Sequence, residues 1–390
     1  MTQEEIDGGV MLREMARFAG MRALAWAGDV LYASRGYEVV RAKVGDVEGR
    51  AGSSTALASR RSGRSNRDEE VSPRSNSGRH DEVLFERAAI YDPPTWRRMT
   101  SRARLSARLV RDGFHALVVH PAGALIGAVP GAIVTSAAGE KSFHVTHAIS
   151  RGTRPLNFAV TPSGKIYWGE YFDNAERDEV HVYASSDAGQ IWQIAYTFAK
   201  GAVRHVHNIV YDRWRDCLWI LTGDYGEECR ILRADCDLRE VRAVLKGTQQ
   251  ARAVAFIPAE DGLYFSTDTP LEQNYICRLS DDGQITRLAP ISSSSVYGCQ
   301  TRSAIFFASM VEPSAVNRDQ NVRVYASRDG EKWSAELAWK KDIWPMKFFQ
   351  YGNAFLPSGE NFTDVLAVTT AAVVVGDGVM RLYDCAPDGI

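Results

Sequence analysis

The eight residues Ser185-Ser186-Asp187-Ala188-Gly189-Gln190-Ile191-Trp192 lie between two strand-like runs, 180–184 and 192–198. They read S-x-D-x-G-x-x-W. The Asp and Ser side chains can bond the backbone a few residues further on, the Gly permits a positive φ, and the Trp can fill the space between neighbouring sheets. This stretch therefore predicts the corner of a β-hairpin.

Shortened copies of this turn recur at regular distances along the chain. They read S-D-D-G at residues 280–283 and S-R-D-G-E-K-W at residues 327–333. Halving the interval between Asp187 and Asp282 leads to Asp235, where a degraded form of the turn is expected. A period of roughly 47 residues built from short strands is typical of propeller blades, so the sequence predicts an all-β fold, a β-propeller.

The motif and its spacing resemble the Asp-box, or BNR-repeat, β-propellers, which include sialidases, over about residues 113–385. We expect one propeller domain over residues 1–390, with seven blades and six as the alternative count. The last blade shows only three strand-like runs, so an N-terminal strand near residues 10–15 could complete it and close the ring. The expected blades are residues 23–89, 114–149, 155–198, 206–245, 251–288, 296–339 and 348–385.

Two segments interrupt the blade pattern. Residues 45–82 are rich in Ser, Arg, Gly, Asn and Glu and almost free of large apolar groups, which predicts a disordered insertion in blade one. Residues 93–112 predict a basic helix between blades one and two, whose arginines face water while its apolar side chains dock on the propeller. A nucleic-acid or anionic-lipid contact is the alternative for this helix.

Composition narrows the class of protein. The net charge is −2, so no global field recruits nucleic acid or membrane. The six cysteines show no C-x-x-C spacing, and we expect buried free thiols rather than disulfides. The acidic N-terminus lacks an apolar signal region and no apolar run reaches membrane-spanning length, which predicts a cytoplasmic location and no membrane span.

Propellers bind ligands at the mouth of the central channel, where the inner strands begin and the second strands end. The candidates expected there combine arginines, carboxylates, tyrosines and an H-x-H pair, as acidic-sugar chemistry requires. Arg22 and Arg35 of blade one are further candidates. The candidate catalytic residues are His205, His207, Asp224, Glu227 and Tyr351. The candidate substrate-binding residues are Arg154, Glu170, Tyr171, Arg204, Arg252, Asp268, Glu312 and Asn353.

The resemblance to sialidases implies a tyrosine nucleophile, Tyr351 or Tyr297 beside a Glu, with Asp224 or Glu227 as acid/base. The Phe/Tyr-Arg-Ile/Leu-Pro motif of the sialidase first blade is missing. The nearest stretches are 20–24 and Thr153-Arg154-Pro155-Leu156.

His205 and His207 lie two residues apart, so on a strand both imidazoles point the same way. With Asp224 or Glu227 they could hold a divalent ion, transfer a proton or bind substrate, or serve only the fold. We expect no obligatory cofactor and assign no metal, with a divalent cation as the alternative.

The sequence thus predicts a glycan-active enzyme, a hydrolase or lyase acting on an acidic saccharide at the channel mouth. The alternative is a non-catalytic propeller that binds a glycan or scaffolds a protein complex. We expect an acidic saccharide as partner and no nucleic acid, and a protein partner is the alternative.

Overall fold

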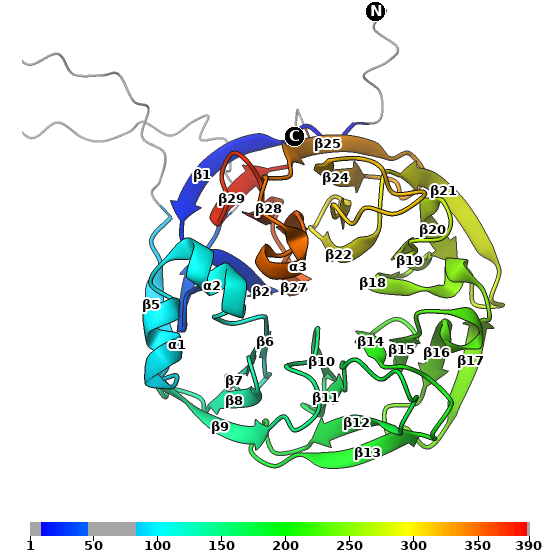
Figure 1. The fold of residues 1–390 in the computed structure, drawn as a ribbon, viewed down its shortest axis with the longest axis horizontal. Helices are drawn as coiled ribbons and strands as arrows, with labels where there is room; N and C mark the ends of the chain where they lie inside the picture. The colour runs from blue at the N-terminus through cyan, green and yellow to red at the C-terminus, as the bar shows by residue number, and fades with distance from the viewer. Residues whose placement is uncertain (1–8, 46–82, 388–390) are drawn as a thin grey trace, which may run out of the picture.

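In a computed structural model that describes residues 9–45 and 83–387, short antiparallel strands form a ring of seven blades around a central channel (Figure 1). In blades one to six the strands run outward from the channel in chain order. The β-propeller fold and the count of seven, made on the described residues, confirm the sequence prediction. Because each blade is a twisted sheet, its apolar faces are buried against the neighbouring blades.

The strands of blades one to three follow the predicted runs closely. Blade one consists of β2 (Arg22–Gly28), β3 (Val30–Arg35), β4 (Glu38–Lys43) and β5 (Glu86–Tyr91). Blade two consists of β6 (Ala116–Val119), β7 (Leu125–Val129), β8 (Ala132–Ser136) and β9 (Ser142–Ala148). Blade three consists of β10 (Ala159–Val160), β11 (Ile166–Gly169), β12 (Val180–Ser185) and β13 (Gln193–Phe198).

The next three blades repeat the same plan. Blade four consists of β14 (Val206–Asp212), β15 (Cys217–Thr222), β16 (Arg230–Ala234) and β17 (Val241–Lys246). Blade five consists of β18 (Ala253–Ala259), β19 (Gly262–Thr267), β20 (Asn274–Leu279) and β21 (Ile285–Ile291). Blade six consists of β22 (Ser295–Gln300), β23 (Ile305–Ser309), β24 (Asn321–Ser327) and β25 (Ser334–Lys340).

Blade seven joins the two ends of the chain. It contains β26 (Asn353–Phe355), β28 (Val365–Ala371) and β29 (Val379–Asp384), and the N-terminal strand β1 (Arg13–Ala19) pairs antiparallel with β29 as the outermost strand. The expectation that an N-terminal strand completes the last blade is confirmed, three residues later than predicted. This pairing removes the free edge that an open ring would leave.

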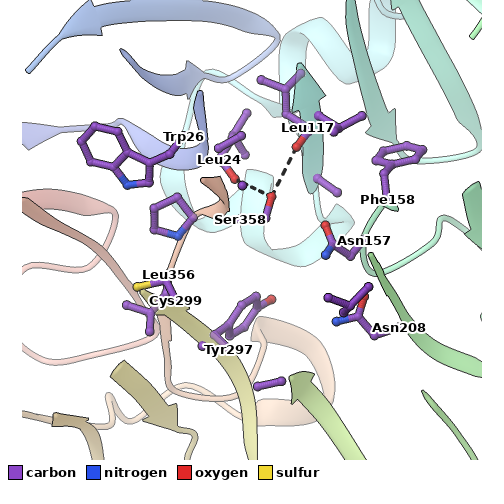
Figure 2. A pocket seen from close by; sticks show the side chains of 18 of the residues that line it. Leu24, Trp26, Leu117, Asn157, Phe158, Asn208, Tyr297, Cys299, Leu356 and Ser358 are labelled. Carbon is purple, nitrogen blue, oxygen red and sulfur yellow. Dashed lines mark hydrogen bonds between the residues drawn. The ribbon is translucent and has the colours of Figure 1, made fainter. Parts of the chain in front are cut away.

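One strand that the sequence analysis missed lies inside the ring. β27 (Ser358–Asn361) pairs parallel with β2, on the channel side of blade one. The Ser358 hydroxyl lies 3.4 Å from the carbonyl oxygens of Leu24 and Leu117, in blades one and two (Figure 2). The segment after β26 therefore occupies part of the channel before the chain returns to β28.

The repeated turns occupy one position in four successive blades. Asp187, Asp235, Asp282 and Asp329 all stand between the third and fourth strands, in blades three to six. Asp187 Oδ1 accepts hydrogen bonds from the Ser185 hydroxyl and from the backbone N–H groups of Gln190 and Ile191. Gly189 has a φ of +82°, and the Trp192 indole reaches Thr146 of blade two. The predicted hairpin corner is therefore present.

The segment between blades one and two differs from the prediction of one helix at 93–112. It contains two short helices, α1 (Thr95–Thr100) and α2 (Arg104–Val110), separated at Ala103, which is extended. The Ser106 hydroxyl bonds the carbonyls of Thr100 and Ala103, and such side-chain bonds compete with a continuous helix. A third helix, α3 (Met346–Phe349), precedes blade seven, and the 3₁₀ turns η2 (Gly226–Glu228) and η3 (Gln249–Ala251) lie in blade four and before blade five.

The remaining expectations concern disorder, cysteines and membranes. Apart from Gly45, the predicted insertion at 45–82 lies outside the described residues. All six cysteines are free thiols, as expected, and four of them are buried. In the part of the chain that the structure describes, none of the helices has the length and apolar character needed to cross a bilayer.

Candidate functional site

The central channel holds a cavity of about 1320 Å³. Its lining comes from the innermost strands of all seven blades and covers most of their length. Apolar side chains such as Leu24, Leu117 and Leu356 line the interior (Figure 2). Charged side chains gather at the end where the inner strands begin, and this end is called the channel mouth below.

One side of the mouth is basic. Arg22, Arg111 and Arg154 line the cavity there with His115, from blade one, the end of α2 and the starts of blades two and three. Among the described residues none of these three arginines forms an ion pair with a carboxylate. Arg22 Nη2 donates to the His115 carbonyl at 3.2 Å, and its guanidinium lies 3.8 Å from the Phe355 ring centre. Its buried Nε has no hydrogen-bond partner within residues 9–45 and 83–387.

In the part of the chain that the structure describes, this side of the mouth presents cations without carboxylate counterions. The pKa of Arg154 is lowered to about 10, mainly by burial and in addition by the charges of Arg111 and Arg22. Burial likewise lowers the pKa of Arg22. The pKa of His115 lies well below its ordinary value because the ring is buried and Arg154 and Arg22 are close. A bound anion would relieve this repulsion.

The opposite side of the mouth is acidic. Asp268 follows β19 in blade five and Glu312 follows β23 in blade six, and both line the cavity. Burial raises the pKa of Asp268 to about 7, with Glu312 adding to the rise and Arg252 opposing it. Tyr171 lies nearby, and burial raises the pKa of its hydroxyl to about 12. Asp268 is thus a group that can exchange a proton near neutral pH.

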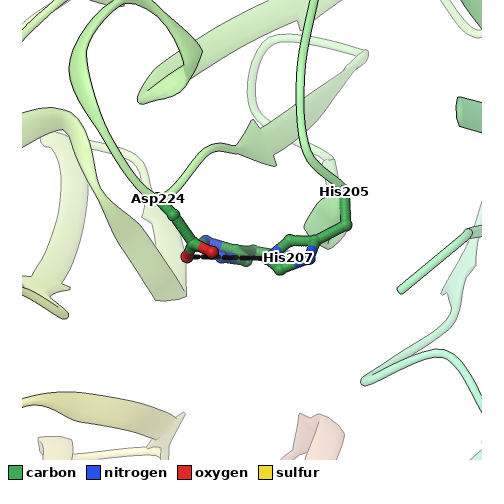
Figure 3. Close-up of side chains that lie close together, drawn as sticks. All are labelled: His205, His207 and Asp224. Atoms are coloured by element: carbon green, nitrogen blue, oxygen red, sulfur yellow. Dashed lines mark hydrogen bonds and ion pairs between the residues drawn. The ribbon is translucent and has the colours of Figure 1, made fainter. Parts of the chain in front are cut away.

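Three predicted catalytic residues lie close together behind the acidic side of the mouth (Figure 3). His207 Nε2 lies 3.0 Å from His205 Nε2 and 3.4 Å from Asp224 Oδ1, and the distance from His205 Nε2 to the same oxygen is 3.6 Å. The histidines flank the start of β14, and Asp224 follows β15 of the same blade. Burial would raise the pKa of Asp224, but the two histidines and Arg252 lower it well below its usual range.

Two arginines connect this cluster to its surroundings. Arg204 Nη1 lies 3.2 Å from Asp224 Oδ2 and also pairs with Asp173. Arg252 Nη2 lies 3.2 Å from Asp224 Oδ1 and 3.4 Å from Asp268 Oδ2. Arg252 and Tyr171 line the channel, whereas the histidines and Asp224 do not, so the cluster lies one layer behind the channel wall.

Other sequence candidates are not brought to the mouth. Glu170 is buried in an ion pair with Arg151 and accepts the His181 N–H, which makes it part of the blade-three framework. Glu227 faces solvent with 72% of its side chain exposed, pairs with Lys246, and is not part of the His205–His207–Asp224 cluster. Arg35 ends β3 with its side chain near Met21 and is not among the cavity-lining residues.

Tyr351 and Asn353 do line the mouth, in blade seven. The Tyr351 hydroxyl has its pKa raised by burial and by the charge of Glu312. Tyr297 also lines the mouth, and its neighbours include Arg22 and Arg154. Both tyrosines expected from the sialidase resemblance therefore reach the cavity, each near a different group of charges.

Sequence reasoning missed two contributors to the basic side. Arg111 belongs to the helix whose arginines were expected to face water, and His115 was not among the candidate residues. Arg111 ends α2 with a φ of +55°, which lies in the left-handed region. A signal was available, because Asp112-Gly113 follows immediately and marks the end of the helix beside blade two.

The comparisons with known proteins identify the fold. No family model matches the sequence, and the search of curated proteins finds no match. Among solved structures, the WD40 β-propeller domain of Doa1 gives a TM-score of 0.53 at 9% identity, over 96% of this chain and 97% of that chain. A catalytically inactive histidine-to-alanine variant of virginiamycin B lyase from Staphylococcus aureus, with quinupristin, gives 0.55 at 8% identity, over 97% and 100%.

A chain of the mitotic checkpoint complex gives a TM-score of 0.53 at 9% identity, over 99% of this chain and 96% of that chain. At such low identities the likeness shows a β-propeller and nothing about activity. One neighbour is a lyase and another belongs to a protein complex, so the fold is compatible with both classes of function. The Asp-box relationship inferred from the turns stays a prediction.

Proposed function

We propose that the channel mouth binds an acidic saccharide and that the protein is a glycan-active enzyme, a hydrolase or lyase. The observation that carries this proposal is the division of the mouth into two sides. Arg22, Arg111 and Arg154 lack carboxylate partners among the described residues, and two carboxyl groups, Asp268 and Glu312, line the side formed by blades five and six.

Each side supplies a different part of the chemistry. A guanidinium presents paired N–H donors that match a carboxylate, so the arginines would hold the acidic group of the sugar. The sugar ring would then extend across the cavity toward blades five and six. There Asp268 would exchange a proton with the glycosidic oxygen or with the carbon next to the carboxylate, and Glu312 or a tyrosine would assist.

The proposal is tested by ligand-induced stabilisation, measured as the change in Tm with a panel of neutral and acidic oligosaccharides. Acidic sugars should raise the Tm of the wild type and of Arg102→Gln, because Arg102 is exposed and outside the cavity. They should not stabilise Arg154→Gln. Asp268→Asn should still bind but should lose turnover. If acidic and neutral sugars act alike on all four proteins, the proposal fails.

A specific surface feature favours the alternative, a non-catalytic propeller that scaffolds a protein complex. Exposed apolar side chains gather beside the mouth, where the segment before α3 bonds the segment after β28 through Asp342 and Ala372, and through Val374 and Lys340. These side chains are Ile343, Trp344, Phe348, Val374 and Val375. Contiguous exposed apolar surface marks protein contacts, here with a partner that presents an apolar surface of its own.

This alternative predicts a different result from the same panel. Sugars would bind weakly or without turnover, and the double variant Ile343→Ser with Phe348→Ser would keep its Tm, since both side chains are already in water. Its association with a partner protein that the wild type binds would be lost. A variant that binds the partner as well as the wild type would remove this alternative.

A further inference from the structure

We propose that His205, His207 and Asp224 bind a divalent first-row transition-metal ion at the junction of blades three, four and five. The inference goes beyond the proposed function, because it does not depend on what the channel binds.

The spacing of the three side chains matches a metal coordination shell. Their facing atoms, two imidazole Nε2 and one carboxylate Oδ1, are separated by 3.0, 3.4 and 3.6 Å. A tetrahedral Zn²⁺ with bonds of about 2.0–2.1 Å places its ligand atoms about 3.3 Å apart. One ion can therefore contact all three atoms without moving any of them far.

The orientation of both rings is set by backbone carbonyls on neighbouring blades. His205 Nδ1 lies 3.0 Å from the Phe172 oxygen of blade three, and His207 Nδ1 lies 3.1 Å from the Ala253 oxygen of blade five. A carbonyl oxygen can only accept, so each Nδ1 carries the hydrogen. This leaves the two Nε2 lone pairs facing each other, which is the arrangement that supporting carbonyls give to metal-binding histidines.

Three acceptors pointing at one place repel one another unless a cation lies between them. The side chains are 7%, 2% and 11% exposed for His205, His207 and Asp224, so water cannot separate them freely. Arg204 Nη1 bonds Asp224 Oδ2, and Arg252 Nη2 lies 3.2 Å from Oδ1, the oxygen that faces the histidines, so two guanidiniums hold the carboxylate in place. Within the described residues this is the one group of three or more His, Cys, Asp or Glu side chains with such geometry.

The donor set indicates which ions fit. Two imidazoles and one carboxylate suit Zn²⁺, Co²⁺, Ni²⁺ or Fe²⁺ better than Ca²⁺ or Mg²⁺, which prefer oxygen ligands. Three protein ligands leave a fourth position for water. Because the rings are anchored to blades three and five, the bound ion would tie three blades together and raise the Tm, by about 5 °C at saturating metal.

The test is a titration of chelator-treated, full-length protein with Zn²⁺ and with Co²⁺. We expect one ion per chain by calorimetry, the visible absorption of four-coordinate Co²⁺, and a higher Tm. His205→Ala and His207→Ala should each weaken binding at least 100-fold. The control is His144→Ala, whose side chain is 68% exposed and outside the cluster, and it should bind as the wild type does.

A folding check keeps the test decisive. Circular dichroism in chelator shows whether each variant retains the strand signal, and His205→Gln replaces any alanine variant that does not. Binding that persists undiminished in folded His205 and His207 variants would overturn the proposal. Failure of the wild type to bind either Zn²⁺ or Co²⁺ would also overturn it and would mean that a shared proton holds the rings together. Neither result affects the saccharide proposal, which is read from ligand-induced stabilisation at the mouth.

Discussion

Asp224 and Asp268 share one nitrogen atom of Arg252. Nη2 lies 3.2 Å from Asp224 Oδ1 and 3.4 Å from Asp268 Oδ2, yet the two carboxyl groups have opposite electrostatics. The histidines add to Arg252 at Asp224 and lower its pKa despite its burial, whereas burial and Glu312 raise the pKa of Asp268 to about 7. The first is suited to hold a cation, and the second to exchange a proton.

Asp268→Asn should change how stability depends on pH. The groups facing Asp268 are Arg252, Glu312, Ser294 and Asp224. The folded protein keeps the Asp268 proton up to about pH 7, whereas the unfolded chain releases it near pH 4. The contribution of Asp268 to the stability of the wild type is therefore lost as the pH rises from 4 to 7, and the Asn variant should lack this contribution, so the difference in stability between the two proteins should change with pH. The free energy of unfolding by denaturant, measured at intervals across this range, checks the prediction.

Parallel pH curves for the wild type and Asp268→Asn would contradict this account of Asp268. Asp173→Asn is the matched control, because Asp173 is exposed with 82% of its side chain in water. Its curve should follow that of the wild type between pH 4 and 7.

Replacing Arg22 by Met should keep or raise stability while weakening the binding of acidic ligands. Arg22 is partly buried, has no carboxylate partner among the described residues and leaves its Nε without a hydrogen bond. Replacing this unpaired charge by an apolar side chain removes the cost of keeping it partly away from water, which should offset the lost contact with the Phe355 ring. Thermal unfolding and ligand titration of the same sample test both halves. A fall in Tm by several degrees would show that Arg22 serves the fold.

Asp187→Ala should cost about 1–3 kcal/mol of stability, because Asp187 accepts one hydroxyl and two backbone hydrogen bonds. The equivalent change at Asp282 should cost less than about 1 kcal/mol, since that carboxylate is exposed and its hydrogen bonds to the side chains of Ser280 and Gln284 compete with water. Urea unfolding of both variants gives the comparison. Equal losses would mean that the turns contribute through the chain conformation rather than through these bonds.

Breaking the pairing of β1 with β29 should open the ring. Ala16 and Arg17 lie opposite Leu382 and Arg381, and prolines at both positions remove at least one ladder hydrogen bond, which contributes about 0.5–1.5 kcal/mol. The exposed edge of β29 should then promote aggregation. Met11→Pro, before the strand, is the control. Light scattering and Tm report the result, and a double variant as stable and monomeric as the control would contradict closure by β1.

Most of the fold could be predicted from the sequence, because successive blades repeat the same turn residues. Asp187 and its counterparts occupy the turn between the third and fourth strands in blades three to six. The number of residues between successive turns gives the size of a blade. β27 escaped prediction because Ser-Gly-Glu-Asn has no strand pattern, and its pairing with β2 depends on residues more than 300 positions away. The break between α1 and α2 depends on the side-chain bonds of Ser106, which helix patterns do not reveal.

Only some of the site residues could be placed from the sequence, because the positions of the others depend on tertiary contacts. His205 and His207 were found because residues i and i+2 of a strand point the same way, and Asp224 because it follows the paired strand. Glu170 and Glu227 were wrongly grouped with them at the rim by their places in the chain, since Arg151 and Lys246 hold them elsewhere. Arg111 joins the mouth only because α2 ends over blade two, which is a tertiary property.

The measurement that tests the central claim most directly is calorimetric titration with a uronate oligosaccharide and with its methyl ester, in which a neutral ester replaces the charged carboxylate. The account predicts that the wild type and Arg102→Gln bind the charged form at least tenfold more tightly than the ester. It also predicts that Arg154→Gln loses this preference. Equal affinities for the acid and the ester in the wild type would contradict the role of the unpaired arginines and with it the acidic-saccharide function.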